Sequence, residues 1–247
     1  MAGESLAALD GQVALPDLKE AFDMGQIQKM PPEAPAEAAI FFAPNIWPEQ
    51  PAGMRAAFET YYDTFEDLAT DIMALFALAL DLPQNFFEPF LQKGLGISVL
   101  RAINYPDQPS APAAGQLRGG AHCDYSTLTI CHIEDKPGGL QIRMPSGEWM
   151  DVPVVPGAFV INLGDLMARW TNDRWVSTMH RVVNPPRDAE GSTRRQSLIF
   201  FHGSRYNAPV ECLPGCSPPG VLPKYEPIGA GDYLVMRFST QNQPVAA

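Results

Sequence analysis

Two kinds of hydrophobic pattern divide the chain. Between residues 53 and 82, apolar residues recur at helical spacing, acidic residues fill other positions, and no Pro or Gly lies inside the run. This pattern predicts one long helix that ends before Pro83, since proline cannot continue a helix. A short helix is expected over residues 83–91, whereas the proline-dense residues 30–52 predict an extended surface connection.

After residue 94 the pattern changes to short segments that are rich in Val, Ile, Thr and aromatic residues and are separated by turn formers. Strands at this spacing predict a β-barrel or a double-sheet jelly roll. We therefore expect a mainly β fold with flanking helices: a double-stranded β-helix core with the long helix of the N-terminal half packed on one sheet. The predicted strands are residues 97–106, 126–133, 139–144, 148–153, 158–164, 175–183 and 196–203.

The length of 247 residues and the hydrophobic content of 46% suit one domain with a sizeable core. We expect residues 1–93 to be mostly loop and helix, residues 95–205 to form the jelly-roll core, and residues 206–247 to form a C-terminal loop and short helix. No internal repeat argues for further domains.

The amino-acid composition limits the classes of molecule that the protein is expected to bind. The formal net charge is −11 and no run of Lys or Arg occurs, which argues against nucleic acid and anionic membranes and favours a small-molecule substrate. Neither a signal peptide nor a membrane-spanning run is recognisable, so a cytoplasmic protein is expected, as a monomer or weak homodimer. The four cysteines are too few for a disulfide scaffold and are expected to be reduced, mostly structural thiols.

The stretch "GGAHCDYSTLTI" at residues 119–130 places a His and an Asp two residues apart. On a strand His122 and Asp124 would project from the same face, and His180 lies in a second predicted strand. Two His and one carboxylate are the facial ligand set of non-haem Fe(II), which leaves positions open for substrates. The pattern alone is weak, because by chance a chain of this composition contains roughly half a His-x-acid match. Taken alone, His180 would more often be a hydrogen-bonded core residue, and His132 and His202 are expected to be structural or pocket-lining.

The segment "RRQSLIFF" places Arg195 and Ser197 on one face of another predicted strand. A planar guanidinium matches a carboxylate in bidentate fashion, so this pair could anchor a carboxylate-bearing cosubstrate. A surface ion pair is the commoner role of an arginine. The apolar run that follows Ser197 argues instead that this strand enters the interior.

In these segments the chain resembles the 2-oxoglutarate/Fe(II)-dependent oxygenases of the isopenicillin N synthase-like group. The resemblance covers nearly the whole chain in order, through "LKEAFDMG", "PNIWP", "RAINYP", "HCDYSTLTI", "GGLQI", "GEWMDVP", "PGAFVINLGDLMARWTNDRWVSTMHRVV", "RQSLIFF" and "DYLVMRF". It implies an enzyme that hydroxylates, desaturates or cyclises a small organic molecule. The reaction would be coupled to the decarboxylation of 2-oxoglutarate to succinate, with Fe(II), 2-oxoglutarate and O2 as cofactor and cosubstrates.

The resemblance also implies roles for single residues. His122, Asp124 and His180 match the family's iron ligands. Arg195 and Ser197 match the residues that bind the distal carboxylate of 2-oxoglutarate.

Two further positions have weaker matches. Tyr105 matches a tyrosine that often adds a hydroxyl to the cosubstrate site, and Phe201 matches a position that lines the substrate pocket.

The sequence departs from the family pattern in two places. Residues 181–194 form a longer loop than usual, which leaves the assigned residues in place. Family members usually have strands and a helix before the segment that matches residues 18–25, so the resemblance implies either an N-terminally shortened member or an incomplete sequence. Missing strands would leave a sheet edge open.

Three alternatives stay open at this level. An oxidase of the same fold that does not use 2-oxoglutarate could keep Arg195 and Ser197 for the carboxylate of its own substrate. A zinc hydrolase could use the same ligands, although no positioned general base is evident. A shortened family member could also act as a non-catalytic binding protein.

Overall fold

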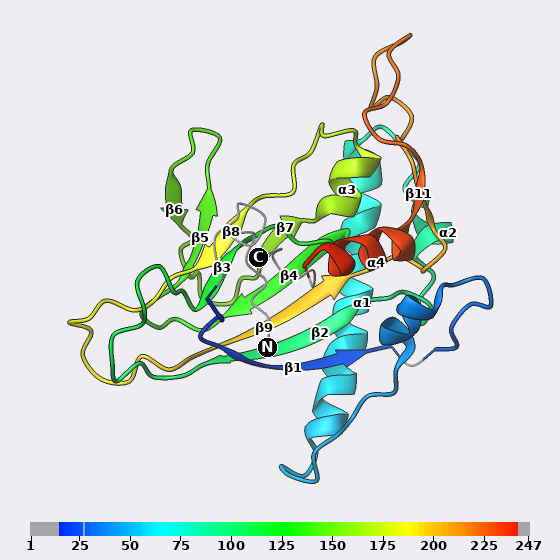
Figure 1. Ribbon diagram of the computed structural model, residues 1–247. Coiled ribbons are helices and arrows are strands. Elements are labelled where there is room, and N and C mark those ends of the chain that lie inside the picture. Colours follow the sequence, from blue (N-terminus) through cyan, green and yellow to red (C-terminus); the bar gives the residue numbers. More distant parts are fainter. Residues whose placement is uncertain (1–14, 27, 242–247) are drawn as a thin grey trace, which may run out of the picture.

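The computed structural model describes residues 15–26 and 28–241. Its architecture is two large antiparallel β-sheets with helices on the outside, and a separate two-stranded sheet (Figure 1). The strands are β1 (Glu20–Gly25), β2 (Val99–Tyr105), β3 (Gly119–His122), β4 (Leu128–Ile133), β5 (Leu140–Arg143), β6 (Trp149–Asp151), β7 (Val160–Leu163), β8 (His180–Val182), β9 (Arg195–His202), β10 (Pro209–Val210) and β11 (Ile228–Gly229). The helices are η2 (Ala36–Phe42), α1 (Met54–Ala79), α2 (Glu88–Leu91), α3 (Asp165–Trp170) and α4 (Ala230–Gln241).

The main sheet has the strand order β1-β2-β9-β4-β7, and the smaller sheet has the order β3-β8-β5-β6. Apart from the hairpin of β5 and β6, consecutive strands from β2 to β9 alternate between the sheets, as in a jelly roll. A small apolar cluster joins the two sheets: Ile103 and Tyr105 of β2 pack with Val182 of β8. The expected double-stranded β-helix core is confirmed, and the chemistry described below lies between its sheets.

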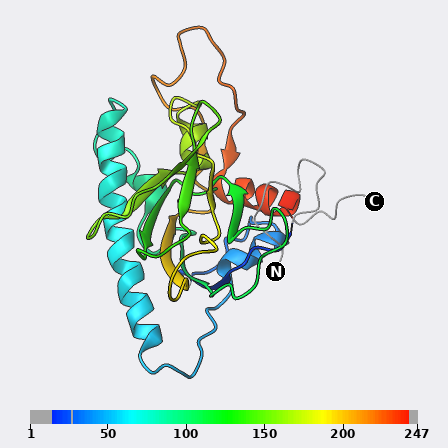
Figure 2. The same ribbon diagram turned by 90° about the vertical axis from the view of Figure 1, so that its left-hand side faces the viewer.

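Helix α1 covers the outer face of the main sheet. Tyr62 and Phe65 of α1 meet Phe200 of β9, with ring centroids 5.2 and 6.1 Å apart. Buried Ala69 and Met73 continue the same helix stripe. Figure 2 shows α1 along one side of the molecule and α4 on the other. The expected packing of the long helix on one sheet is confirmed.

Two helices are shorter than predicted: the short helix expected over residues 83–91 is confined to α2 (Glu88–Leu91), and α1 ends early. Helix α1 stops at Ala79, whereas the pattern predicted helix up to residue 82. The backbone of Asp81 has a φ of 59°, and the amide of Leu82 donates to the carbonyl of Ala77, so the chain turns before Pro83. The residue before a proline avoids helical geometry, which accounts for the early end.

The observed strands differ from the predicted ones in several places, because β1, β3, β10 and β11 fall outside the predicted segments and one predicted strand is shortened. Residues 20–25 form β1, a strand that the hydrophobic pattern did not predict. Only Met24 of β1 is buried, so the segment lacks a clear hydrophobic alternation, and its pairing with β2 makes it a strand. The predicted strand 175–183 is reduced to β8, because residues 171–179 form a loop in which the Thr171 hydroxyl accepts from the amide of Trp175.

Of the helices that the structure describes, none combines the length and hydropathy needed to cross a bilayer.

Candidate metal centre

Three side chains converge between the two sheets. His122 ends β3 and His180 begins β8, and antiparallel pairing places these two residues directly opposite each other. Asp124 lies in the loop that leads from β3 to β4. Each residue offers one ligand atom, and the three atoms lie within 4.8 Å of one another.

The prediction that His122 and Asp124 project from the same face of one strand is wrong. His122 is the last residue of β3, and Asp124 belongs to the loop that crosses from the small sheet to the main sheet. The crossing turns the carboxylate back toward both imidazoles. Asp124 Oδ1 lies 3.8 Å from Nε2 of His122 and 3.6 Å from Nε2 of His180.

Backbone carbonyls orient both imidazoles. Nδ1 of His122 lies 2.7 Å from the carbonyl oxygen of Gly120, and Nδ1 of His180 lies 2.9 Å from that of Thr178. A carbonyl oxygen only accepts, so each Nδ1 carries the hydrogen and each Nε2 presents a lone pair. The pattern is typical of metal-ligating histidines, whose second ring nitrogen is held by a fixed acceptor.

The carboxylate of Asp124 is held by its other oxygen. The Thr129 hydroxyl and the Asn162 amide each donate to Oδ2 at 2.7 Å, and Asp124 is 5% exposed. These bonds leave Oδ1 directed at the imidazoles. Sequence reasoning missed Thr129 and Asn162, although both are polar residues inside predicted strands, and such positions signal a buried hydrogen-bonding partner.

The loop that carries Asp124 is fixed by the start of α3. The amide of Asp165 donates to the carbonyl of Asp124 at 2.8 Å, and the amide of Gly164 donates to that of Thr127 at 3.1 Å. A Cβ on Gly164 would lie 2.1 Å from the carbonyl oxygen of Ser126. Only glycine permits this approach of β7 and α3 to the ligand loop.

Arg195 lies at the start of β9 and is 2% exposed. Its Nη2 donates to the Ser197 hydroxyl at 3.2 Å, and its Nη1 donates to the carbonyl of Gly138 at 3.4 Å. Among the described residues it forms no ion pair, so the surface ion pair considered from the sequence is wrong. A buried guanidinium without an acid is a site for a ligand carboxylate, because an unpaired buried charge is costly.

One cavity connects these groups. Its lining includes the three candidate ligands, Arg195, Ser197 and the two weaker candidates Tyr105 and Phe201, and it extends to Arg101 and Lys19. Cys131 also lines it, and burial raises the pKa of that thiol to about 12. At neutral pH Cys131 is therefore a neutral thiol and not a thiolate ligand.

The other two histidines lie away from this cavity. His202 is 2% exposed, and its Nδ1 lies 2.7 Å from the hydroxyl of Thr127. Burial lowers the pKa of His202 to about 4. It is a core residue, whereas His132 lies on the outer face of the main sheet.

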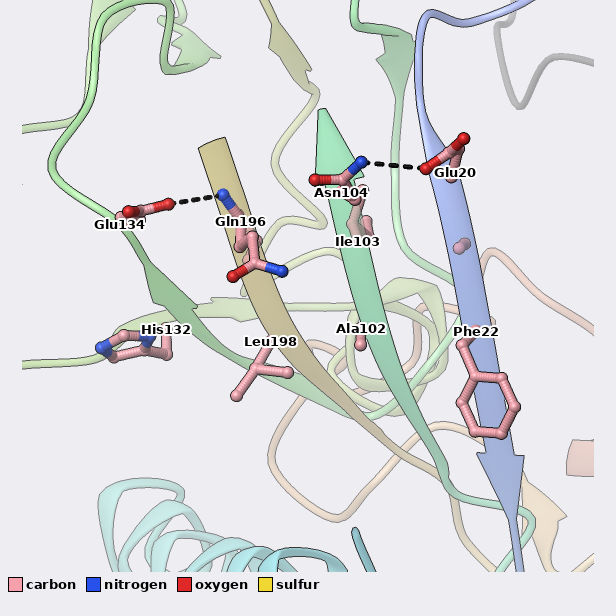
Figure 3. Close-up of a pocket in the computed structure, with 11 residues that line it drawn as sticks. Glu20, Phe22, Ala102, Ile103, Asn104, His132, Glu134, Gln196 and Leu198 are labelled. Carbon is pink, nitrogen blue, oxygen red and sulfur yellow. Dashed lines mark hydrogen bonds between the residues drawn. The ribbon is translucent and has the colours of Figure 1, made fainter. Parts of the chain in front are cut away.

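A larger hollow of about 500 Å³ lies on that outer face. Figure 3 shows Phe22, Ala102, Leu198 and His132 lying across β1, β2, β9 and β4, with Asn104 bonded to Glu20 at one side. By strand alternation this face is the one on which α1 packs. The hollow contains none of the candidate ligands, so size alone does not identify the reactive site.

The segment that carries the candidate centre matches a known protein family. Residues 96–204 match the family model described as the 2OG-Fe(II) oxygenase superfamily. The match covers the strands and loops that carry every residue of the candidate centre.

Individual relatives agree with this family match. The 2-oxoglutarate-Fe(II) type oxidoreductase hxnY of Emericella nidulans is 36% identical over 224 residues, which are 89% of this chain and 62% of that protein. The chain therefore spans less than two thirds of the length of this relative.

Two solved structures have the same fold. A full-length Neurospora crassa protein, solved in complex with alpha-KG and thymine, is 31% identical, with a TM-score of 0.80 over 92% of this chain and 66% of that one. A 2OG-Fe(II) oxygenase family protein from Caulobacter crescentus, described as putative, is 32% identical. Its TM-score is 0.77 over 92% of this chain and 71% of that one.

Proposed function

The chain belongs to the 2OG-Fe(II) oxygenase superfamily, and on that premise we propose that it is an Fe(II)- and 2-oxoglutarate-dependent dioxygenase. The observation that carries the proposal is the presence in one cavity of a two-His, one-carboxylate donor set and a buried arginine without an acid. The substrate is a small organic molecule. The similar Neurospora crassa protein was solved with alpha-KG and thymine, which supports this class of substrate and this cosubstrate. In a hydroxylation, substrate, 2-oxoglutarate and O2 give hydroxylated substrate, succinate and CO2.

His122, Asp124 and His180 hold the metal. These residues would fit Fe(II), because two imidazole nitrogens and one carboxylate oxygen are the donor set that non-haem iron takes. Bound iron supplies the activation of O2. The protein presents both Nε2 lone pairs and a fixed carboxylate oxygen, so little rearrangement is needed on metal binding.

Arg195 and Ser197 bind the distal carboxylate of 2-oxoglutarate. Their side chains project from the same face of β9, and both are 2% exposed. Tyr105 is paired with Arg195 across β2 and β9, and its ring lies 5.0 Å from the guanidinium, so it forms a wall of the cosubstrate site.

Phe201 lines the part of the cavity that would hold the substrate. This residue lies two positions beyond Ile199 on the cavity face of β9, and the Arg101 guanidinium lies 5.5 Å from its ring. The wall at this end thus combines an aromatic ring with a guanidinium whose charge is paired with Asp23. Hydroxylation, desaturation and ring closure are all compatible with this wall.

The main competing function is an oxidase that needs no 2-oxoglutarate. In that enzyme Arg195 would hold a carboxylate of the substrate itself. The two functions differ in whether succinate is formed.

Arg195→Ala tests the proposal. Loss of a charge-assisted contact costs on the order of 1.5 to 3 kcal/mol, so the apparent KM for 2-oxoglutarate should rise at least about tenfold. The measurement is succinate formation by the Fe(II)-loaded protein. Arg143→Ala, which removes an exposed arginine of β5, is the matched control and should leave the KM unchanged. Succinate formation with an unaltered KM in Arg195→Ala would refute this anchor, whereas substrate turnover by the wild type without succinate would favour the oxidase.

We also infer a reducing compartment, the cytoplasm. All four cysteines are free, and Fe(II) requires reducing surroundings. The net charge of −11 supports a monomer or weak homodimer that does not bind nucleic acid.

A further inference from the structure

Arg118 lies just before β3 and is a second buried cation near the cavity. Its side chain is 0% exposed. Nη1 donates to the carbonyl of Pro137 at 3.0 Å, and Nη2 donates to the carbonyls of Pro106 and Thr193 at 3.2 and 2.6 Å. Its Nε is buried with no hydrogen-bond partner, and among the described residues Arg118 forms no ion pair. All of its hydrogen-bond partners are therefore neutral oxygens.

Arg118 and Arg195 share their surroundings. Both guanidinium groups lie against the ring of Tyr105, at 5.8 and 5.0 Å from its centroid. Both also bind one turn, since Arg118 donates to the carbonyl of Pro137 and Arg195 to that of Gly138. The turn at Pro137 and Gly138 therefore contacts both guanidinium groups.

The glycine in the turn is required by its contacts. Gly138 has a φ of 76°, and a Cβ there would lie 2.6 Å from the nitrogen of Pro185 and 3.0 Å from Nη1 of Arg118. The backbone thus packs directly on the guanidinium.

The nearby acid does not neutralise this pair of charges. Burial, and after it the charge of Arg195, lower the pKa of Arg118, while Asp107 acts in the opposite direction. Asp107 is exposed, and its carboxylate accepts from the amides of Thr193 and Arg194. Among the described residues neither buried guanidinium is paired with an acid, although the buried aspartate of the candidate metal centre lines the cavity, and two unpaired like charges favour a ligand of double negative charge.

On the premise of the proposed function, we propose that Arg118 is a positioning residue that selects a doubly charged cosubstrate. It adds a positive charge behind Tyr105, and it fixes the turn at Pro137 and Gly138 that orients Arg195. 2-Oxoglutarate carries two carboxylates at neutral pH, and its distal carboxylate would lie in the combined field of both arginines.

Binding of two 2-oxo acids tests this role. The Fe(II)-loaded protein is titrated in a calorimeter without O2, once with 2-oxoglutarate and once with 2-oxopentanoate, which has a methyl group in place of the distal carboxylate. Arg118→Gln should reduce the preference for 2-oxoglutarate by about tenfold and leave the affinity for 2-oxopentanoate nearly unchanged. Arg118→Lys, which keeps the charge, should retain most of the preference.

Arg187→Gln is the matched control. Arg187 also donates to two loop carbonyls, those of Gln108 and Ser110, but it is exposed, so its loss should leave the preference unaltered. An unchanged preference in folded Arg118→Gln, or an equal loss of affinity for both acids, would overturn the proposal and leave a purely structural role. If Arg118→Gln does not fold, Arg118→Met decides instead: a reduced preference for 2-oxoglutarate supports the proposal and an unchanged one overturns it. A wild-type protein that shows no preference would instead contradict the proposed function.

Discussion

At the scale of single residues, the candidate centre depends on side chains that would not touch the metal. The donor atoms of His122, Asp124 and His180 are oriented before any ligand arrives, by backbone carbonyls and by Thr129 and Asn162. A ligand set held in this way loses little conformational entropy on binding.

Asn162→Ala should therefore weaken Fe(II) binding by about ten- to a hundredfold, because Asp124 Oδ2 loses one of its two donors and the carboxylate can rotate. The measurement is an anaerobic titration with Fe(II). Asn104→Ala is the control, since Asn104 bonds Glu20 on the other face of the main sheet. Equal affinity in Asn162→Ala and the wild type would mean that Thr129 alone holds the carboxylate.

At the scale of elements, the junction of β7 and α3 positions the ligand loop. Gly164→Ala should lower the free energy of unfolding by about 3 kcal/mol, because its Cβ would overlap the Ser126 carbonyl at 2.1 Å and push the loop away. Weaker Fe(II) binding should accompany the loss, since Asp124 lies in that loop. Urea unfolding and metal titration measure the two effects.

Gly139→Ala is the matched control for this junction. A Cβ at Gly139 has no atom within 4 Å, so its stability should change by less than about 0.5 kcal/mol. A stable Gly164→Ala variant with normal Fe(II) affinity would show that the loop has room to move.

The packing of α1 on the main sheet gives a second prediction for an element. Phe65 is 4% exposed and contacts the ring of Phe200, so Phe65→Ala should cost about 3 to 5 kcal/mol of unfolding free energy. Leu75→Ala, on the exposed face of α1 at 63% exposure, should change stability little. Thermal and urea unfolding measure the stability of the two variants. An equal loss of unfolding free energy in both would contradict this orientation of α1.

At the scale of the whole molecule, the buried imidazole of His202 makes stability depend on pH. Its pKa is about 4 in the folded protein, below the ordinary 6.5, because burial disfavours the charged form. Between these values the unfolded chain binds a proton that the folded chain does not. The stability that depends on neutral His202 is fully present above about pH 6.5. As the pH falls to 4, the free energy of unfolding decreases by roughly 3 kcal/mol through this group.

The prediction is a shallower loss of stability in acid for His202→Gln than for the wild type, measured by urea unfolding between about pH 7.5 and 4.5. His132→Gln, which removes an imidazole from the outer hollow, is the matched comparison variant. Parallel curves for His202→Gln and the wild type would show that His202 does not titrate in this window.

The sequence by itself predicted the fold class and indicated the candidate site residues. Helical spacing over residues 53–82 and short β-rich segments predicted a long helix on a jelly roll, because local periodicity reports which face of an element is buried. His122, Asp124 and His180 were candidates because few residue types ligate a metal, and Arg195 with Ser197 because they alternate onto one strand face. Residue type and short-range spacing carry this information.

Only the tertiary structure decided how distant segments complete the site. It made β1 a strand through pairing with β2, and it placed Asp124 in a crossing loop rather than on β3. It also brought Asn162 to the carboxylate from 38 residues away, and it buried Arg118 beside Arg195 without an acid. These contacts join residues far apart in the chain, so no local pattern encodes them. They form because folding buries polar groups together and requires each to find a partner.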